Sequence, residues 1–175
     1  IKVLLDTVAQ AQILGEAGRA AGVSPSAFIE IDCDGHRGGL RVDDPKLLDV
    51  ASAMKVAGVT LAGVLTHAGE SYALDTPQAL EAAAENERAV AVDAATRLRA
   101  AGHDCPIVSV GSTPTAHFAQ ALDGVTEMRA GVYMFFDLVM HGVGVCSTSD
   151  LALSVLATVI LSLIHISEPT RQEAI

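Results

Sequence analysis

Residues that could bind an anion or move a proton gather in four short segments, each of which follows an aliphatic run. These segments are residues 32–39, 66–72, 111–115 and 129–133. The third is typical of an anion cradle, because its glycine lets backbone amides approach a ligand and a helix start favours negative charge. Arg37 and Arg129 add permanent positive charge in two other segments. Either arginine taken singly is more often a surface or ion-pair residue, so the prediction of an anion site rests on the whole set.

Two histidines lie in these segments and are candidates for acid–base work. His67 precedes Tyr72 in one segment, and His36 lies in another. An isolated histidine is more often structural than catalytic, and Glu70 and Asp34 could equally be solvated loop carboxylates. The chain contains no phosphate-binding Walker loop, no GxGxxG dinucleotide motif and no HExxH zinc helix.

Hydrophobic periodicity predicts an alternation of strands and helices that would position these segments. We expect strands at 1–5, 27–31, 60–65, 107–110 and 127–134, and helices at 8–21, 43–57, 76–101 and 116–122. Asp6 or Thr7 can cap the first helix, and Gly22 can end it. Residues 151–160 are expected to form a further strand, although their periodicity also permits a buried helix.

The alternation with short connections predicts right-handed βαβ units and a parallel sheet. An open doubly wound sheet and part of an eight-stranded barrel both fit this pattern. In either architecture ligands bind at the carboxyl ends of the strands, where the four segments lie.

Composition narrows the class of protein. The chain has 175 residues, half of them hydrophobic and few aromatic, which is typical of a parallel sheet covered by Ala-rich helices. The net charge of −10 argues against nucleic-acid binding. Cys33, Cys105 and Cys146 are far apart and predict free thiols. Residues 151–164 are too few and too polar to span a membrane, and no signal peptide is recognised, so we expect a cytoplasmic protein without membrane or nucleic-acid partners.

The four segments also carry a resemblance to a known family. IEIDCDGHRGGL, THAGESY, VSVGSTPTA and EMRAGVYMFFDLVM occur in order and resemble the D-serine dehydratase and D-threonine aldolase family, relatives of alanine racemase among the barrel-type pyridoxal-phosphate (PLP) enzymes. The resemblance implies an α/β fold: a partial (β/α)8 TIM barrel, strands four to eight, over residues 1–148. Residues 149–160 would begin a β-rich second domain. Family members with this architecture commonly form homodimers.

The resemblance implies roles for individual residues. Arg37 would approach the phenolic oxygen of PLP, Arg129 would face its pyridine nitrogen, and Tyr133 would line the pocket. A guanidinium at that nitrogen would keep it unprotonated, because two cations repel. The phosphate would be bound by Gly111, Ser112 and Thr113 with the backbone of Gly131 and Val132. His67 and Tyr72 would face a small D-amino acid substrate.

The implied reaction is a lyase reaction on a D-β-hydroxy amino acid. Elimination of the hydroxyl group would give a keto acid and ammonia, and retro-aldol cleavage would give glycine and an aldehyde. A divalent metal, Zn or Mn, would assist either route. Three alternatives stay open: an alanine-racemase-like racemase, a non-catalytic PLP-binding protein, and an α/β domain for another phosphorylated ligand.

Two departures from the family limit what this chain is expected to do alone. The lysine that holds PLP lies on the first barrel strand of the family, upstream of Ile1, and the metal ligands lie beyond Ile160. Glu70 stands where the family has histidine. Residues 161–171, LSLIHISEPTR, resemble a translated sequencing adapter, so residues 161–175 are expected to be a non-native tail. We therefore expect the chain to be a fragment without activity.

Overall fold

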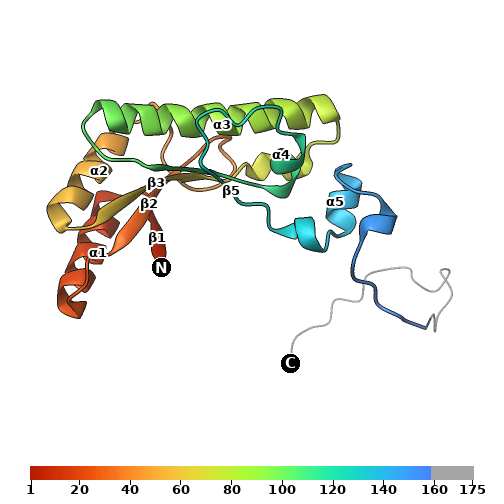
Figure 1. The fold of residues 1–175 in the computed structure, drawn as a ribbon, viewed down its shortest axis with the longest axis horizontal. Helices are drawn as coiled ribbons and strands as arrows, with labels where there is room; N and C mark the ends of the chain where they lie inside the picture. Colours follow the sequence, from red (N-terminus) through yellow and green to blue (C-terminus); the bar gives the residue numbers. More distant parts are fainter. Residues whose placement is uncertain (159–175) are drawn as a thin grey trace, which may run out of the picture.

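The computed structural model describes residues 1–158, in which strands and helices alternate (Figure 1). The strands are β1 (Lys2–Leu5), β2 (Ser26–Ile31), β3 (Thr60–Thr66), β4 (Ile107–Val110) and β5 (Glu127–Met128). The α-helices are α1 (Val8–Ala21), α2 (Lys46–Ala57), α3 (Pro77–Ala100), α4 (Thr113–Phe118) and α5 (Leu138–Gly142). Short 3-10 helices lie at η1 (Gly69–Ala73), η2 (Val132–Met134) and η3 (Thr148–Asp150). The predicted alternation is confirmed.

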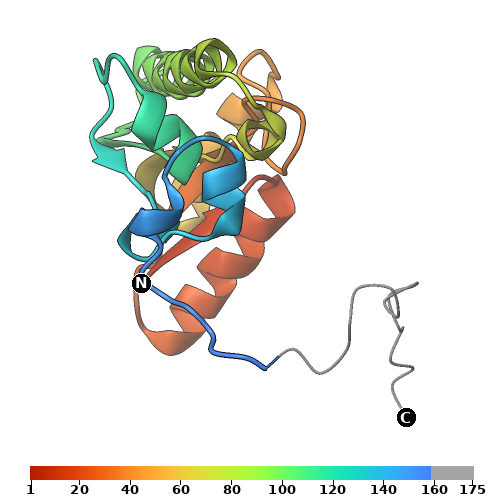
Figure 2. The same cartoon turned by 90° about the vertical axis from the view of Figure 1, so that its right-hand side faces the viewer.

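The five strands form one parallel sheet, and their order in the sheet is their order in the chain, β1-β2-β3-β4-β5. A doubly wound sheet reverses its order at a switch point, whereas a (β/α)8 barrel adds each strand beside the one before it. The order therefore matches the predicted partial barrel and not the doubly wound alternative. Figures 1 and 2 show α1, α2 and α3 along the same side of the curved sheet.

The main helices begin and end at the capping residues that the sequence indicates. Thr7 caps α1 through a capping box with Gln10, and Gly22 ends it in the left-handed conformation, with φ 66°. Thr76 caps α3, whose first residue is proline. These local signals fix the lengths of the helices that cover the sheet.

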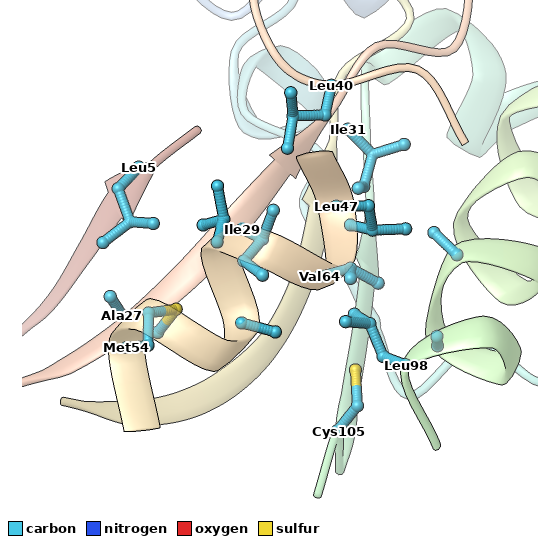
Figure 3. Packing of buried hydrophobic residues seen from close by; sticks show 14 of the residues in the cluster. Leu5, Ala27, Ile29, Ile31, Leu40, Leu47, Met54, Val64, Leu98 and Cys105 are labelled. Atoms are coloured by element: carbon cyan, nitrogen blue, oxygen red, sulfur yellow. The ribbon is translucent and has the colours of Figure 1, made fainter. Parts of the chain in front are cut away.

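The core lies between the sheet and the helices (Figure 3). Side chains alternate between the two faces of a strand, and in β2 the residues Ala27, Ile29 and Ile31 face the helices. They pack against buried side chains of α2 and α3, among them Leu47, Met54 and Leu98. Phe28 and Glu30 therefore face the other side of the sheet, which is the side that a closed barrel encloses.

A second cluster fixes the chain after β5. Met140, Val143 and Val145 on and after α5 are buried against Leu80 at the start of α3. This packing holds α5 beside the end of α3 that lies near the carboxyl ends of the strands (Figure 1).

The predicted fifth strand over residues 127–134 is wrong after Met128. Its Arg129 N–H donates to Val110 C=O, but Val110 is the last residue of β4, and the chain then turns into α4. The backbone beyond Arg129 has no further strand to pair with, and η2 forms over Val132–Met134 instead.

Two other predicted elements differ from the structure. The helix expected at 116–122 lies at Thr113–Phe118, because Ser112 caps it and a proline fits its first turn. The strand expected at 151–160 is absent from residues 151–158: the Ala152 N–H donates to Phe135 C=O outside the sheet, and Val155 and Leu156 are fully exposed. The rest of that segment, and the predicted tail at 161–175, lie outside the described residues.

Two further predictions concern membrane spans and cysteines. No helix over residues 1–158 is long and apolar enough to cross a membrane. Cys33, Cys105 and Cys146 are free thiols, as predicted.

Candidate active site

The carboxyl ends of β2, β3, β4 and β5 bring the four polar segments to one edge of the sheet, as predicted from parallel strands. Contacts join the segments pairwise. Arg129 after β5 reaches the end of β3, Val132 reaches the segment after β4, and Gly69 after β3 packs against Arg37 after β2. Residues far apart in the sequence therefore form one site.

Arg129 crosses the inner face of the sheet at this edge. Its Nε donates to Ser109 Oγ at 2.8 Å, and its Nη2 donates to Thr66 C=O. Ser109 Oγ in turn donates to Glu127 Oε1 at 2.5 Å. Burial lowers the pKa of Arg129. Nearby carboxylates, with Glu87 the largest contributor, only partly offset this lowering. Two contacts from one planar group fix the guanidinium in orientation as well as position.

Gly111 lets the β4 and β5 segments approach closely. A Cβ at this position would overlap the Arg129 carbonyl oxygen. Ser112 then caps α4, since its Oγ accepts the Thr115 N–H at 3.2 Å, and both hydroxyl side chains are buried. The predicted anion cradle is thus an ordered turn whose hydroxyl groups are held beneath the surface.

A buried carboxylate, Glu87, joins this turn to the segment after β3. Glu87 lies within α3, and only 2% of its surface is exposed. Its Oε1 accepts the N–H groups of Ala68 and Gly111, both at 3.0 Å, and its Oε2 accepts the Thr115 hydroxyl at 2.7 Å. Burial raises the pKa of Glu87, and the three hydrogen bonds oppose that rise. The Gly111 N–H is therefore directed at Glu87.

Sequence reasoning missed Glu87, although the sequence holds a signal. The buried residues of α3 recur at helical spacing, and they are Leu80, Ala84, Glu87, Ala91, Ala94, Ala95 and Leu98. A single carboxylate in such an apolar stripe marks a buried polar group that must find partners.

The segment after β5 faces the same turn. Thr113 Oγ1 accepts the Val132 N–H at 3.1 Å, which ties the two predicted phosphate segments together. A Cβ at Gly131 would meet no atom within 4 Å, so the backbone is open there. Tyr133 is 57% exposed. The structure thus brings Thr113 and Val132 into contact, and leaves the side chain of Tyr133 directed to solvent.

His67 and Tyr72 lie together at the end of β3. Their rings stack with centroids 6.1 Å apart and an angle of 17° between the planes. Burial lowers the pKa of His67, and the positive charges of Arg37 and Arg129 lower it further. The imidazole is consequently biased toward its neutral form, which can accept a proton.

The segment after β2 packs against Gly69 and Glu70, in the same segment as this pair. The His36 ring and the Arg37 stem pack on the backbone at Gly69, where a Cβ would meet them at 2.7–3.1 Å. His36 Nδ1 lies 3.0 Å from Glu70 Oε2, and Asp34 Oδ2 accepts the Glu70 N–H at 2.9 Å. Glu70 therefore closes a polar contact between two segments, and Arg37 itself is exposed.

Several known proteins resemble this chain over most of its length. D-threo-3-hydroxyaspartate dehydratase from Delftia sp. (strain HT23) is 60% identical over 91% of this chain and 42% of the relative. Its solved structure has a TM-score of 0.84 and covers 86% of this chain and 40% of that chain. D-serine dehydratase from Dictyostelium discoideum is 33% identical over 77% of this chain and 36% of the relative.

A third relative extends the set to an aldolase. The structure of D-threonine aldolase from Filomicrobium marinum has a TM-score of 0.73 at 27% identity, over 80% of this chain and 38% of that chain. The chain spans about two fifths of the length of these three relatives.

Residues 1–139 match the family described as "Alanine racemase, N-terminal domain". The matched range contains all five strands and the four segments of the site. The chain therefore belongs to the family of the alanine racemase N-terminal domain, within the barrel-type class of pyridoxal-phosphate proteins.

Proposed function

We propose that this chain is the cofactor-binding part of a PLP-dependent lyase that acts on D-3-hydroxy amino acids. The observation that carries the proposal is the convergence of the four segments at one edge of the sheet, with Arg129 held by β3 and β4. Support comes also from the relatives, whose names describe dehydratases and an aldolase of D-amino acids.

The residues at this edge suit the chemistry of PLP. A phosphate needs N–H and hydroxyl donors, and the turn at Ser112 and Thr113 provides them beside Gly131, where the backbone is open to a ligand. A ring nitrogen needs a fixed partner, and the Arg129 guanidinium is held by two contacts. Arg37 is exposed on the same edge and would contact the phenolic oxygen.

When bound, PLP supplies an electron sink for negative charge that develops on the α-carbon of an amino acid. The residues of this chain would bind the cofactor and orient it. Arg129 presents N–H donors and a permanent positive charge, so a nitrogen beside it stays unprotonated. Ser112 and Thr113, with the backbone at Gly131 and Val132, are proposed to anchor the phosphate end. Gly111 contributes its close approach to Arg129 and no donor, because its N–H is directed at Glu87.

His67 and Tyr72 are proposed to face the substrate. The lowered pKa of His67 keeps an imidazole nitrogen available to accept or hold a proton near neutral pH. The Tyr72 phenol, stacked on that ring, can donate a hydrogen bond to a substrate oxygen. Tyr133 is proposed to line the same pocket when a ligand is bound.

The divalent metal expected for the lyase does not fit the residues described. No group of three or more His, Cys, Asp or Glu side chains within residues 1–158 is arranged to hold a metal ion. Zn or Mn ligands, if the whole protein uses them, would come from elsewhere, and no step in this chain is assigned to a metal.

The whole protein is proposed to be longer than this chain, because the two dehydratase relatives are more than twice its length. Residues 1–148 would belong to the barrel and 149–160 to the start of a second domain. The lysine that binds PLP would lie outside the chain, so the chain alone would be inactive. A cytoplasmic location and a homodimer belong to the same proposal.

The first experiment is to sequence the source locus with long reads and assay the complete protein with PLP. We expect a lysine on an upstream strand and release of a keto acid and ammonia from D-threo-3-hydroxyaspartate or D-serine. Interconversion of D- and L-alanine without elimination would instead favour a racemase. A PLP spectrum without turnover would favour a non-catalytic binding protein, and absence of any PLP spectrum would refute the proposal.

A further inference from the structure

We propose that Glu87 is a positioning residue for the phosphate end of the cofactor site. From within α3 it holds the segments after β3 and β4 in the arrangement that binds the phosphate. This inference rests on the proposed function, and it assigns Glu87 no contact with cofactor or substrate.

The first argument is the set of groups that Glu87 joins. Its Oε1 accepts both Ala68 N–H and Gly111 N–H at 3.0 Å. These two groups follow different strands and are separated in the chain by the whole of α3 and β4. One oxygen atom therefore fixes the distance between the segment that carries His67 and the turn that carries Ser112.

The second argument is a closed network of buried polar groups that begins at the other oxygen. Oε2 accepts the Thr115 hydroxyl at 2.7 Å, and Thr115 Oγ1 lies 2.8 Å from Ser112 Oγ. Ser112 Oγ lies 2.9 Å from Ser71 Oγ, which donates to Ala68 C=O at 2.7 Å. The network thus returns to the residue whose N–H Glu87 binds. Each of its hydroxyl groups is at most 2% exposed.

Removal of the carboxylate would leave several buried donors without a partner. An unsatisfied buried group costs more than an ordinary hydrogen bond contributes, so the two segments would move to satisfy their N–H groups. The phosphate binds through fixed N–H and hydroxyl groups of the turn, whereas the pyridine ring binds elsewhere. The loss should therefore fall on binding of the phosphate and not on binding of the ring.

The test compares PLP with pyridoxal, which lacks the phosphate, on the whole protein. We expect Glu87→Ala to weaken PLP binding by about tenfold or more, as for loss of hydrogen bonds to a charged group. Pyridoxal affinity should change much less. Glu87→Gln should restore most of the PLP affinity, because its amide oxygen can still accept both N–H groups. Glu81→Ala removes an exposed carboxylate from the same helix and should change neither affinity.

Equal weakening of PLP and pyridoxal in Glu87→Ala, or no weakening of either, would overturn the inference. If Glu87→Ala does not fold, Thr115→Val removes the hydroxyl through which Oε2 is connected to Ser112, and the same selective loss of PLP affinity is expected. A ratio of PLP affinity to pyridoxal affinity that is unchanged in Thr115→Val would also contradict the inference. A wild-type protein that binds no PLP would refute the proposed function and this inference together, whereas PLP binding with an unchanged ratio refutes the inference alone.

Discussion

Two charged side chains organise the candidate site from opposite sides of the sheet. Arg129 lies on the inner face, where its guanidinium contacts Ser109 and the end of β3. Glu87 lies on the helix side and accepts N–H groups from two segments. Each charge contributes to the pKa shift of the other. The geometry of the loops thus depends on charged groups that are partly or fully removed from water.

The orientation of Arg129 can be tested by Arg129→Lys. Lysine keeps the charge but cannot present two fixed donors, so it loses contact with Ser109 or with Thr66. We expect kcat/KM of the complete enzyme to fall about ten- to hundredfold, the equivalent of one hydrogen bond to a charged group. Steady-state kinetics with Arg41→Lys, an exposed arginine, provide the control. Full activity in Arg129→Lys would show that charge alone suffices.

The protonation of Glu87 makes a prediction about stability and pH. Because burial raises its pKa above the ordinary value of 4.5, the folded state binds this proton more tightly than the unfolded state. The stabilising contribution is therefore complete below pH 4.5 and is lost as pH rises through the folded pKa. Denaturant unfolding of wild type and Glu87→Gln measures this. The unfolding free energy of wild type minus that of Glu87→Gln should fall as pH rises. A difference that grows with pH would contradict this sign.

The place of the site could be predicted because four polar segments each follow an aliphatic strand. Arg37 and Arg129 were singled out as charged residues near glycine at strand ends, whereas their roles toward PLP are implied by the family resemblance and stay predictions. Glu87 was not found, because its partners lie 19 to 28 positions away on two loops. Such a contact becomes visible only once the sheet order is known.

The close approach of β3 and β4 restricts which residue can occupy position 63, one of the strand positions before the site. Between β2 and β3 the register shifts after Ala27, so that Phe28 pairs with Gly63. Gly63 has φ 153°, and a Cβ there would overlap the Ile107 carbonyl oxygen of β4. The irregularity precedes the residues that β3 delivers to the site. A glycine is therefore required at this position by the packing of two strands.

Gly63→Ala should destabilise the protein through that overlap. The strand cannot move without breaking its pairing, so we expect a loss of about 2–3 kcal/mol of unfolding free energy, as for overpacking in a core. The denaturant midpoint of the complete protein measures it. Gly142→Ala is the matched control, because a Cβ there meets nothing within 4 Å and alanine favours a helix. Equal stability of the two variants would mean that β3 and β4 can separate at no cost.

Elements were predictable where their signals are local. The helices at α1, α2 and α3 follow from caps and apolar spacing, and four of the strands follow from aliphatic runs. The end of β5 was not predictable, because it depends on where β4 stops at Val110. The strand expected at 151–160 is absent from residues 151–158 for a related reason, since aliphatic residues form a strand only beside a partner.

At the scale of the whole molecule, the sheet has an open edge. Within residues 1–158, β1 pairs only with β2, and its residues Val3 and Leu4 are about 40% exposed. After β5, Met134, Phe135 and Leu138 are also exposed. An edge strand with apolar neighbours is a template for association with other chains. Since the two dehydratase relatives are more than twice as long, we infer that further residues of the whole protein cover these surfaces.

The chain produced alone should therefore associate and lack activity. We expect residues 1–158 to elute as oligomers in size-exclusion chromatography with light scattering, and to melt without a cooperative transition. The complete protein, prepared in parallel, should give one defined species and a cooperative melt, because its additional residues pair with β1 and cover the apolar surface. A monomeric, cooperatively melting chain 1–158 would contradict this expectation. It would show that the five-stranded sheet with its helices is a stable unit by itself, and that the exposed edge at β1 does not cause association.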